Sequence, residues 1–515
     1  MHGRLKVRTT EEEAARKKLE QDEKMKAYRG AMERIREKRE QGELDREMLD
    51  ITRKLLSSNP DIYTLWNVRK ECFEELRLAV NEEEMKDLHQ ADLLFTEQCL
   101  QVNPKSYGAW HHRGWILETR PDPNWNREVD LCTKYLKLDE RNFHCWDYRR
   151  YVAEKAGVTP ESELAFCTQK IEHNFSNYSS WHYRSKLLPL LFPHETDPQR
   201  AIAEDKLRSE LELVLTAAFT DPKDSSAWFY QRWLLGYSEL PLDFAAFRQT
   251  NSLITVAFTK AVNLNLCKLS GGSLPPETTA KWESSTGNTY DTVWIKTLSP
   301  KVENTKGSPG DDLLFIDENN QEYRLPVKSC KDDGIIGVKL PKFEHIFGKA
   351  VVSQLKEQLD SCNQLLEFEP DSKWTLLTAA LLMRAIDRKA YHARALEFLR
   401  KLQSVDSLRC GYYQDLATKW TVEQVIEKWI EAGDFDAPID LSCLQITTIP
   451  YEQFMSIARQ VNLSGNQLND RSLFKLLALQ NCTHLNVQQN NLTEEGLRGL
   501  QLKMHQVDIL SDFSG

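Results

Sequence analysis

The chain has 515 residues and a formal net charge of −10 at pH 7, with 28% charged and 41% hydrophobic residues. This length exceeds one ordinary hydrophobic core and predicts several domains, while the lack of a basic excess argues against nucleic-acid binding. The longest uncharged, apolar-rich run, Trp374 to Met383, is too short for a membrane span, which needs about 20 residues.

The N-terminus and the cysteines both favour a reducing, cytoplasmic location. The first residues, MHGRLKVRTTEEEAARKK, lack the apolar segment of a secretory signal. The 11 cysteines form no CxxC pair, so neither a disulfide framework nor a zinc module is expected. Residues 10 to about 50 are rich in Glu, Lys, Arg and Gln, which predicts a charged helix that is either solvated or docked on a partner.

Five tryptophans mark an internal repeat. The repeated segments read NPDIYTLWNVR, NPKSYGAWHHR, DERNFHCWDYR, NFSNYSSWHYR and DPKDSSAWFYQR, with Trp66, Trp110, Trp146, Trp181 and Trp228 at spacings of 44, 36, 35 and 47 residues. This period is typical of helix pairs that stack into a solenoid. Four repeats place an arginine three residues after the tryptophan, and the fifth has Gln231 there. Because positions i and i+3 share a helix face, we expect these side chains to serve stacking rather than catalysis.

The pattern changes after about residue 245. Alternating runs such as Ile254–Phe258 and Tyr323–Val327, separated by clusters of Gly, Pro, Ser and Asn, predict an inserted all-β domain, an Ig-like sandwich. Helical periodicity resumes near Ala350, and Trp374 further on marks a degenerate sixth repeat.

The last eighty residues carry a third pattern. IDLSCLQI, VNLSGNQL and LNVQQNNL align as leucine-rich repeats with a period of 22 and 24 residues, and Asn466 and Asn490 hold the position whose side chain bonds turn backbone. The sequence thus predicts a multidomain chain: an α-α superhelix with an inserted all-β sandwich and a C-terminal leucine-rich repeat array. The expected domains are 1–244 (helical repeats, first part, with the charged N-terminal helix), 245–345 (sandwich), 346–436 (helical domain, continued) and 437–515 (leucine-rich repeats).

Conventional catalytic and metal-binding motifs are missing, because the chain contains no GxxxxGK[ST], HExxH or GxSxG pattern. A positional signal remains five residues before the tryptophan, where three repeats carry Lys105, Arg141 and Lys223. A cation near a helix N-terminus opposes the helix dipole at a cost of about 0.3–1 kcal/mol. Two interpretations stay open: exposed residues that tolerate this penalty, or a rim where helix N-termini and cations receive an anion.

In these motifs the chain resembles the α-subunits of protein prenyltransferases. The resemblance covers roughly residues 45–240 and 360–385, and NPKSYGAWHHRGW and ERNFHCWDYRR are its specific matches. A β-insert together with a leucine-rich array further resembles the type II branch of the family, the Rab geranylgeranyltransferases. The α-subunit that serves the CaaX enzymes has neither addition, which argues against that alternative.

The resemblance implies a heterodimer that transfers geranylgeranyl from geranylgeranyl diphosphate to C-terminal cysteines of Rab GTPases, with a Rab escort protein presenting the substrate. The separate β-subunit is expected to hold Zn²⁺ and the isoprenoid pocket, so no metal is expected in this chain alone. The family's active-site lysine corresponds to Lys105, its tyrosine to Tyr107, and a diphosphate-facing histidine to His144. We expect all three to bind substrate, and Lys105 and His144 to be catalytic. A neighbouring tyrosine of the family is Phe143 here, so its hydroxyl is lost or supplied elsewhere.

One further residue and one rival function complete the expectations. His2 is a candidate for an autoinhibitory contact with the partner's zinc, with a plain terminal histidine as the alternative. The rival function is a non-enzymatic helical-repeat scaffold for protein–protein interaction. Lys105 and His144, both in register with a diphosphate, favour the enzyme.

Overall fold

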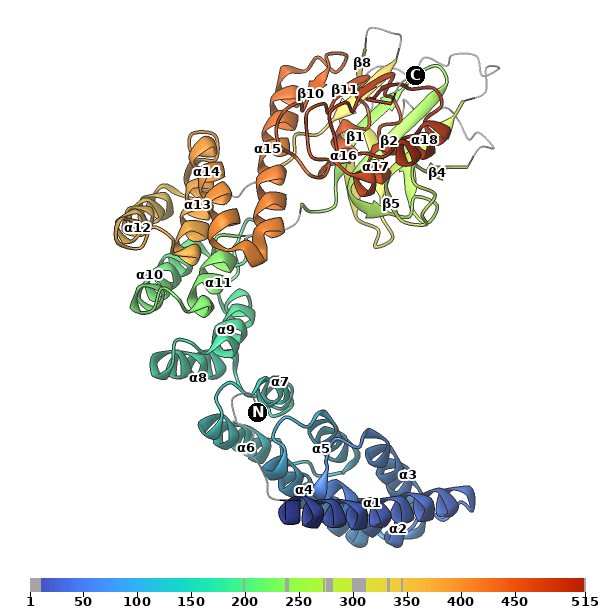
Figure 1. Cartoon of the computed structure of the whole chain (residues 1–515), viewed down its shortest axis with the longest axis vertical. Coiled ribbons are helices and arrows are strands. Elements are labelled where there is room, and N and C mark those ends of the chain that lie inside the picture. Colours follow the sequence, from blue (N-terminus) through green and yellow to red (C-terminus); the bar gives the residue numbers. More distant parts are fainter. Residues whose placement is uncertain are drawn as a thin grey trace. The chain divides into compact units, whose positions relative to one another are not determined.

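The computed structural model describes residues 11–197, 200–236, 240–271, 274, 281–298, 312–330, 334–343 and 346–513. It divides into two compact units, Met1–Leu187 and Leu188–Gly515 (Figure 1). None of the described helices is long and apolar enough to cross a membrane.

The first unit consists of helix pairs in two layers. Helix α2 packs on α3 and α4, α3 packs on α5, and α5 packs on α7. The stacked helical repeats predicted from the tryptophans are therefore confirmed. The helices are α1 (Glu11–Glu40), α2 (Arg46–Ser58), α3 (Tyr63–Ala79), α4 (Glu82–Val102), α5 (Tyr107–Thr119), α6 (Trp125–Leu138), α7 (Phe143–Lys155), α8 (Pro160–His173) and α9 (Tyr178–Leu191), which runs past the boundary.

Turns with the same hydrogen-bonding pattern precede α3, α5, α7 and α9. The Asn or Asp that ends the preceding helix accepts a backbone N–H two residues further on, which shapes the turn. The tryptophan Nε1–H then donates to the carbonyl six residues before it, at 2.7–2.9 Å. In three turns this carbonyl also accepts a bond from a polar side chain just before the next repeat's tryptophan helix: Pro60 O from Ser106, Pro104 O from Asn142, and Glu140 O from Asn177.

The repeated arginine connects three helices, and Arg113 shows how. Its guanidinium bonds both carboxylate oxygens of Glu128 on α6, at 2.6 and 2.7 Å. It also donates to Leu93 O and Thr96 Oγ1 on α4, at 2.8 and 2.9 Å. Both charged side chains are fully buried, so each needs the other. Equivalent bonds join Arg149 to Glu163 and Thr133, and Arg69 to Asp92 and Thr52.

The second unit begins with two helices, is interrupted by strands, and then returns to helices. Helix α10 packs on α11 and α12, and α11 packs on α13. Where the fifth repeat lacks the arginine, Gln231 donates to Gln358, and Gln358 donates to Leu211 O, so an amide pair joins α11, α12 and α10. The helices are α10 (Glu204–Thr220), α11 (Ser225–Leu234), α12 (Lys349–Phe368), α13 (Lys373–Asp387), α14 (His392–Val405) and α15 (Cys410–Ala432).

The strands between α11 and α12 form two antiparallel sheets. The larger has the order β4-β5-β2-β1-β9-β8 and the smaller β3-β6-β7. Phe244, Phe258 and Phe315 lie in the core between them, with ring centroids 4.4–6.0 Å apart. The strands are β1 (Phe244–Gln249), β2 (Leu253–Val262), β3 (Lys268–Ser270), β4 (Glu283–Ser284), β5 (Asp291–Thr297), β6 (Leu313–Ile316), β7 (Glu322–Leu325), β8 (Lys328–Ser329) and β9 (Ile335–Val338).

The C-terminal region is a ladder of four short parallel strands. Its order is β10-β11-β12-β13, and Ile439, Val461, Leu485 and Ile509 are in register. The Asn466 side chain bonds turn backbone, accepting from Leu444 N and donating to Leu441 O at 3.0 and 2.8 Å. The elements are β10 (Ile439–Asp440), α16 (Glu452–Met455), β11 (Gln460–Asn462), α17 (Asp470–Leu476), β12 (His484–Asn486), α18 (Glu494–Lys503) and β13 (Asp508–Leu510).

The large sheet and the C-terminal region share one hydrophobic core. Ala246 and Val293 of the sheet belong to the same buried cluster as Phe454 and Leu477 of the C-terminal region and Ile426 of α15. Arg248, which is 1% exposed, strengthens the junction by donating to Ile457 O and to Asp436, at 2.9 and 2.7 Å.

We expect the Arg113→Met variant to lose about 3–5 kcal/mol of unfolding free energy, because Glu128 stays buried without its cation. The double variant R113M/E128M should recover most of this loss, since no buried charge remains. Urea-unfolding midpoints of the three proteins measure both effects. A double variant no more stable than R113M would contradict this account of the arginine.

Candidate functional site

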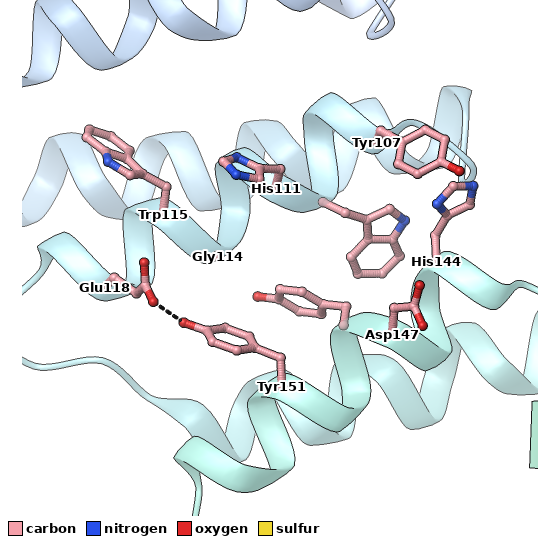
Figure 2. A pocket seen from close by; sticks show the side chains of 10 residues that line it. Tyr107, His111, Gly114, Trp115, Glu118, His144, Asp147 and Tyr151 are labelled. Carbon is pink, nitrogen blue, oxygen red and sulfur yellow. Dashed lines mark hydrogen bonds between the residues drawn. The ribbon is translucent and has the colours of Figure 1, made fainter. Parts of the chain in front are cut away.

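A groove between α5 and α7 contains two of the three predicted substrate-binding residues (Figure 2). Its volume is about 370 Å³. Tyr107 and His144 lie at one end, and Glu118 and Tyr151 lie at the other. The lining residues are Tyr107, Trp110, His111, Gly114, Trp115, Glu118, His144, Asp147, Tyr148 and Tyr151.

Local structure places Lys105 and Tyr107 at the start of α5. Lys105 N donates to Asn103 Oδ1 at 3.0 Å, which holds the lysine in the turn. Ser106 caps the helix, and Tyr107 is its first residue, with its ring largely exposed. Gly108 is required next, because a Cβ there would lie 2.5 Å from the Trp66 ring. The close approach of α5 to the preceding repeat thus presents Lys105 and Tyr107 at the surface.

His144 is tied to the same turn through Asn142. The Asn142 side chain accepts His144 N–H at 3.1 Å and donates to Pro104 O at 2.9 Å. Pro104 immediately precedes Lys105, so one side chain fixes α7 against the lysine turn. His144 is 7% exposed, and its ring meets the Tyr107 ring edge-on, with centroids 4.2 Å apart.

The His144 end of the groove favours a neutral imidazole until an anion arrives. Burial lowers the pKa of His144, the Asp147 carboxylate opposes this, and the Lys105 ammonium lowers the pKa further. Lys105 is exposed. An anion bound near both groups would be attracted by the Lys105 ammonium, and its negative charge would favour proton uptake by His144.

Aromatic rings line the middle of the groove. Gly114 leaves the floor open, since a Cβ there would only touch the rings of Tyr148 and Tyr151, at 3.7 and 3.8 Å. At the far end Tyr151 donates to Glu118 at 2.6 Å. Lys70 Nζ lies 3.3 Å from His111 Nδ1 and 5.5 Å from the centre of the Trp115 ring.

The structure brings Tyr107 and His144 together and places Lys105 within electrostatic reach of His144. Phe143 precedes His144 on α7, and the centroids of the two rings lie 3.9 Å apart. His2 lies outside the described residues. Sequence reasoning missed Asn142 and Asp147. The signal for Asn142 was present, because it is a typical N-cap residue immediately before a predicted tryptophan helix.

The comparisons with known proteins agree on one family. The model of the protein prenyltransferase alpha subunit repeat matches residues 45–76, 89–120, 125–156, 160–191 and 207–238. The geranylgeranyl transferase type-2 subunit alpha of Mus musculus is 40% identical over 509 residues, covering 96% of this chain and 88% of that protein. The Homo sapiens protein of the same name is 39% identical, over 96% of this chain and 88% of its own length.

Two further matches are partial or weak. The protein of the same name from Dictyostelium discoideum is 40% identical over 237 residues, which are 46% of this chain and 75% of that protein. A solved structure, the Candida albicans protein geranylgeranyltransferase-I complexed with GGPP, covers 76% of this chain and 89% of its own at 15% identity. Its TM-score of 0.41 is too low for anything to follow from it.

We expect the affinity of this protein for inorganic diphosphate to depend on pH through His144. Because the pKa of His144 is lowered in the free protein, anion binding should raise it and take up a proton. The affinity gained from His144 should be largest below the pKa of the free protein and be lost as the pH rises through the raised pKa of the complex. Calorimetry in two buffers of different ionisation enthalpy measures the proton uptake. The H144Q variant is the control, because it leaves the ionisation of diphosphate itself unchanged, and equal uptake by both proteins would contradict the prediction.

Proposed function

The chain belongs to the geranylgeranyl transferase type-2 alpha subunit family and is a transferase subunit, and from this membership we propose how its residues serve the reaction. The substrate is geranylgeranyl diphosphate, and the acceptors are C-terminal cysteines of Rab GTPases presented by an escort protein. A separate β-subunit completes the enzyme in the cytoplasm.

In the proposed mechanism, this chain stabilises the leaving group. The thiolate of the acceptor cysteine attacks C1 of the isoprenoid, a C–S bond forms, and the C1–O bond breaks. The electron pair leaves with the diphosphate, whose negative charge grows during this step. Lys105 and His144 would meet that charge where it develops, with Tyr107 offering a hydroxyl beside them. One positioned donor of this kind is worth about 2.7–4 kcal/mol of barrier.

The observation that carries this proposal is the bond from Asn142 to Pro104 O. It joins the first turn of α7 to the turn that holds Lys105, and the ammonium of Lys105 acts electrostatically on the buried histidine of the next repeat.

We assign zinc and the isoprenoid pocket to the β-subunit. In the ranges that the structure describes, no three or more His, Cys, Asp or Glu side chains come together as a metal site. The described residues therefore offer no site for zinc, and no step in the proposed mechanism runs through zinc in this chain. His2 stays a proposal for an autoinhibitory contact with the partner's zinc.

We further propose the finer architecture: helical repeats in 1–244 and 346–436, an Ig-like sandwich in 245–345 and leucine-rich repeats in 437–515. Two antiparallel sheets around an aromatic core support the sandwich, and the parallel ladder with its asparagine bonds supports the repeats.

Lys105→Ala should slow single-turnover transfer at least tenfold, about 1.4 kcal/mol, because it removes a cation facing the leaving group. Heterodimer assembly should survive, since an exposed residue ahead of a helix adds little to stacking. Lys223→Ala is the matched control, because Lys223 holds the same turn position, with its backbone N–H bonded to Asp221, and should be nearly silent. Equal slowing by both variants would indicate a general basic potential, and no slowing by K105A would remove Lys105 from the reaction.

The inserted segment 240–345 and the C-terminal region after residue 437, together the accessory regions, should be dispensable only as a pair. A chain that stops near residue 437 exposes Ala246 and Val293 of the large sheet, so it should aggregate or melt at lower temperature. Replacing 240–345 by a short linker in the same truncated chain should restore solubility and leave β-subunit association and transfer largely intact. Gel filtration with the β-subunit and a transfer assay provide the measurements. Complete loss of the heterodimer in the doubly deleted chain would place the interface on the accessory regions.

A further inference from the structure

His144 shares its end of the groove with a second titratable side chain, Asp147. The two residues are three apart on α7 and therefore lie on one face of the helix. Both line the groove, and Figure 2 shows the carboxylate beside the imidazole, on the side away from Tyr107. No direct bond is needed for them to interact, because charges that line one groove influence each other through space.

The groups around His144 come from four places. Asp147 belongs to its own helix, Tyr107 to α5, Lys105 to the turn before α5, and Asp61 to the turn before α3. Burial lowers the pKa of His144 most, and Asp147 has the largest effect of the charged groups, in the raising direction. Lys105 lowers the pKa, and Asp61 raises it with a smaller effect. Asp147 is thus the main group that keeps protonation of His144 accessible.

Arg150 holds Asp147 in place. The two side chains form an ion pair one turn apart on α7. The pair fixes the carboxylate and weakens its field at His144, because the guanidinium charge partly cancels it. Loss of the arginine would therefore act on His144 in the direction opposite to loss of the carboxylate.

We propose that Asp147 is a positioning residue for prenyl transfer, whose carboxylate favours the protonated imidazole of His144 as the departing diphosphate gains charge. The inference rests on the proposed role of His144 at the diphosphate. Asp147 itself does not touch the leaving group, since a carboxylate against a diphosphate would be repelled. The C1–O electron pair goes to the diphosphate, the proton stays on His144, and no bond to Asp147 forms.

The first test measures the proton affinity of His144 directly. In the assembled heterodimer with ¹³C-labelled histidine in this chain, the His144 signal is assigned by its loss in H144Q. We expect D147N to move its titration to lower pH and R150Q to move it to higher pH. D61N, the matched carboxylate control, should move it less than D147N. An unchanged titration in D147N overturns the inference by itself.

The second test follows single-turnover transfer across pH. D147N should slow transfer about threefold or more near neutral pH, because a smaller fraction of His144 is protonated. Its pH profile should shift towards acid, and lowering the pH should restore the rate. A purely structural defect would slow transfer equally at every pH, and a faster D147N would mean that the carboxylate only repels the diphosphate. Either result overturns the inference. A moved titration with an unchanged profile also overturns it and traces the failure to the proposed role of His144.

Discussion

The carbonyl six residues before each tryptophan is the point on which the helical repeats depend. It accepts the indole Nε1–H of its own repeat, and in the turns at Pro60, Pro104 and Glu140 it also accepts a polar side chain of the next repeat. A buried carbonyl and a buried indole N–H would each be costly if unpaired. One oxygen satisfies two donors from different repeats, so it fixes the turn and the stacking of the next helix together. In α3, α5 and α7 the buried arginine then connects the tryptophan helix with the helices on either side.

The candidate site follows from this stacking rather than from a dedicated pocket domain. Lys105 belongs to one repeat and His144 to the next, and the Asn142 bond to Pro104 O brings the two repeats into register. The same bond that stabilises the solenoid therefore sets the distance between a cation and an imidazole. Lys223 occupies an equivalent turn, but the tryptophan helix that packs next on α11 is α13, where Ser372 holds the place before Trp374 that His144 holds before Trp146. Lys105 and Lys223 thus share a position in their repeats, and they differ in the residues that the neighbouring repeat supplies.

The second unit shows that segments distant in sequence can share one core. Strands β1, β2, β5 and β9 bury one face against β6 and β7 and the other against the C-terminal region. Arg248 crosses this junction to bond Asp436, almost two hundred residues further along the chain. The insert and the C-terminal region are therefore linked in stability even where their functions differ. Any truncation that treats them as independent exposes a sheet face made of small apolar side chains.

The sequence by itself determined the helical repeats, the places where the pattern changes, and the residues that resemble a prenyltransferase α-subunit. It could do so because tryptophan spacing, strand alternation and the NPKxY motif are local patterns along the chain, and the first two follow from the periodicity of helices and strands. It did not reveal that Glu128 and Glu163 receive the repeated arginines, that Asn142 holds His144 at the Lys105 turn, or that Asp147 shares the groove. Those contacts join side chains from different helices or depend on which face a helix buries. Only the tertiary structure decides them, because the direction of a side chain across a helix interface depends on how the two helices pack.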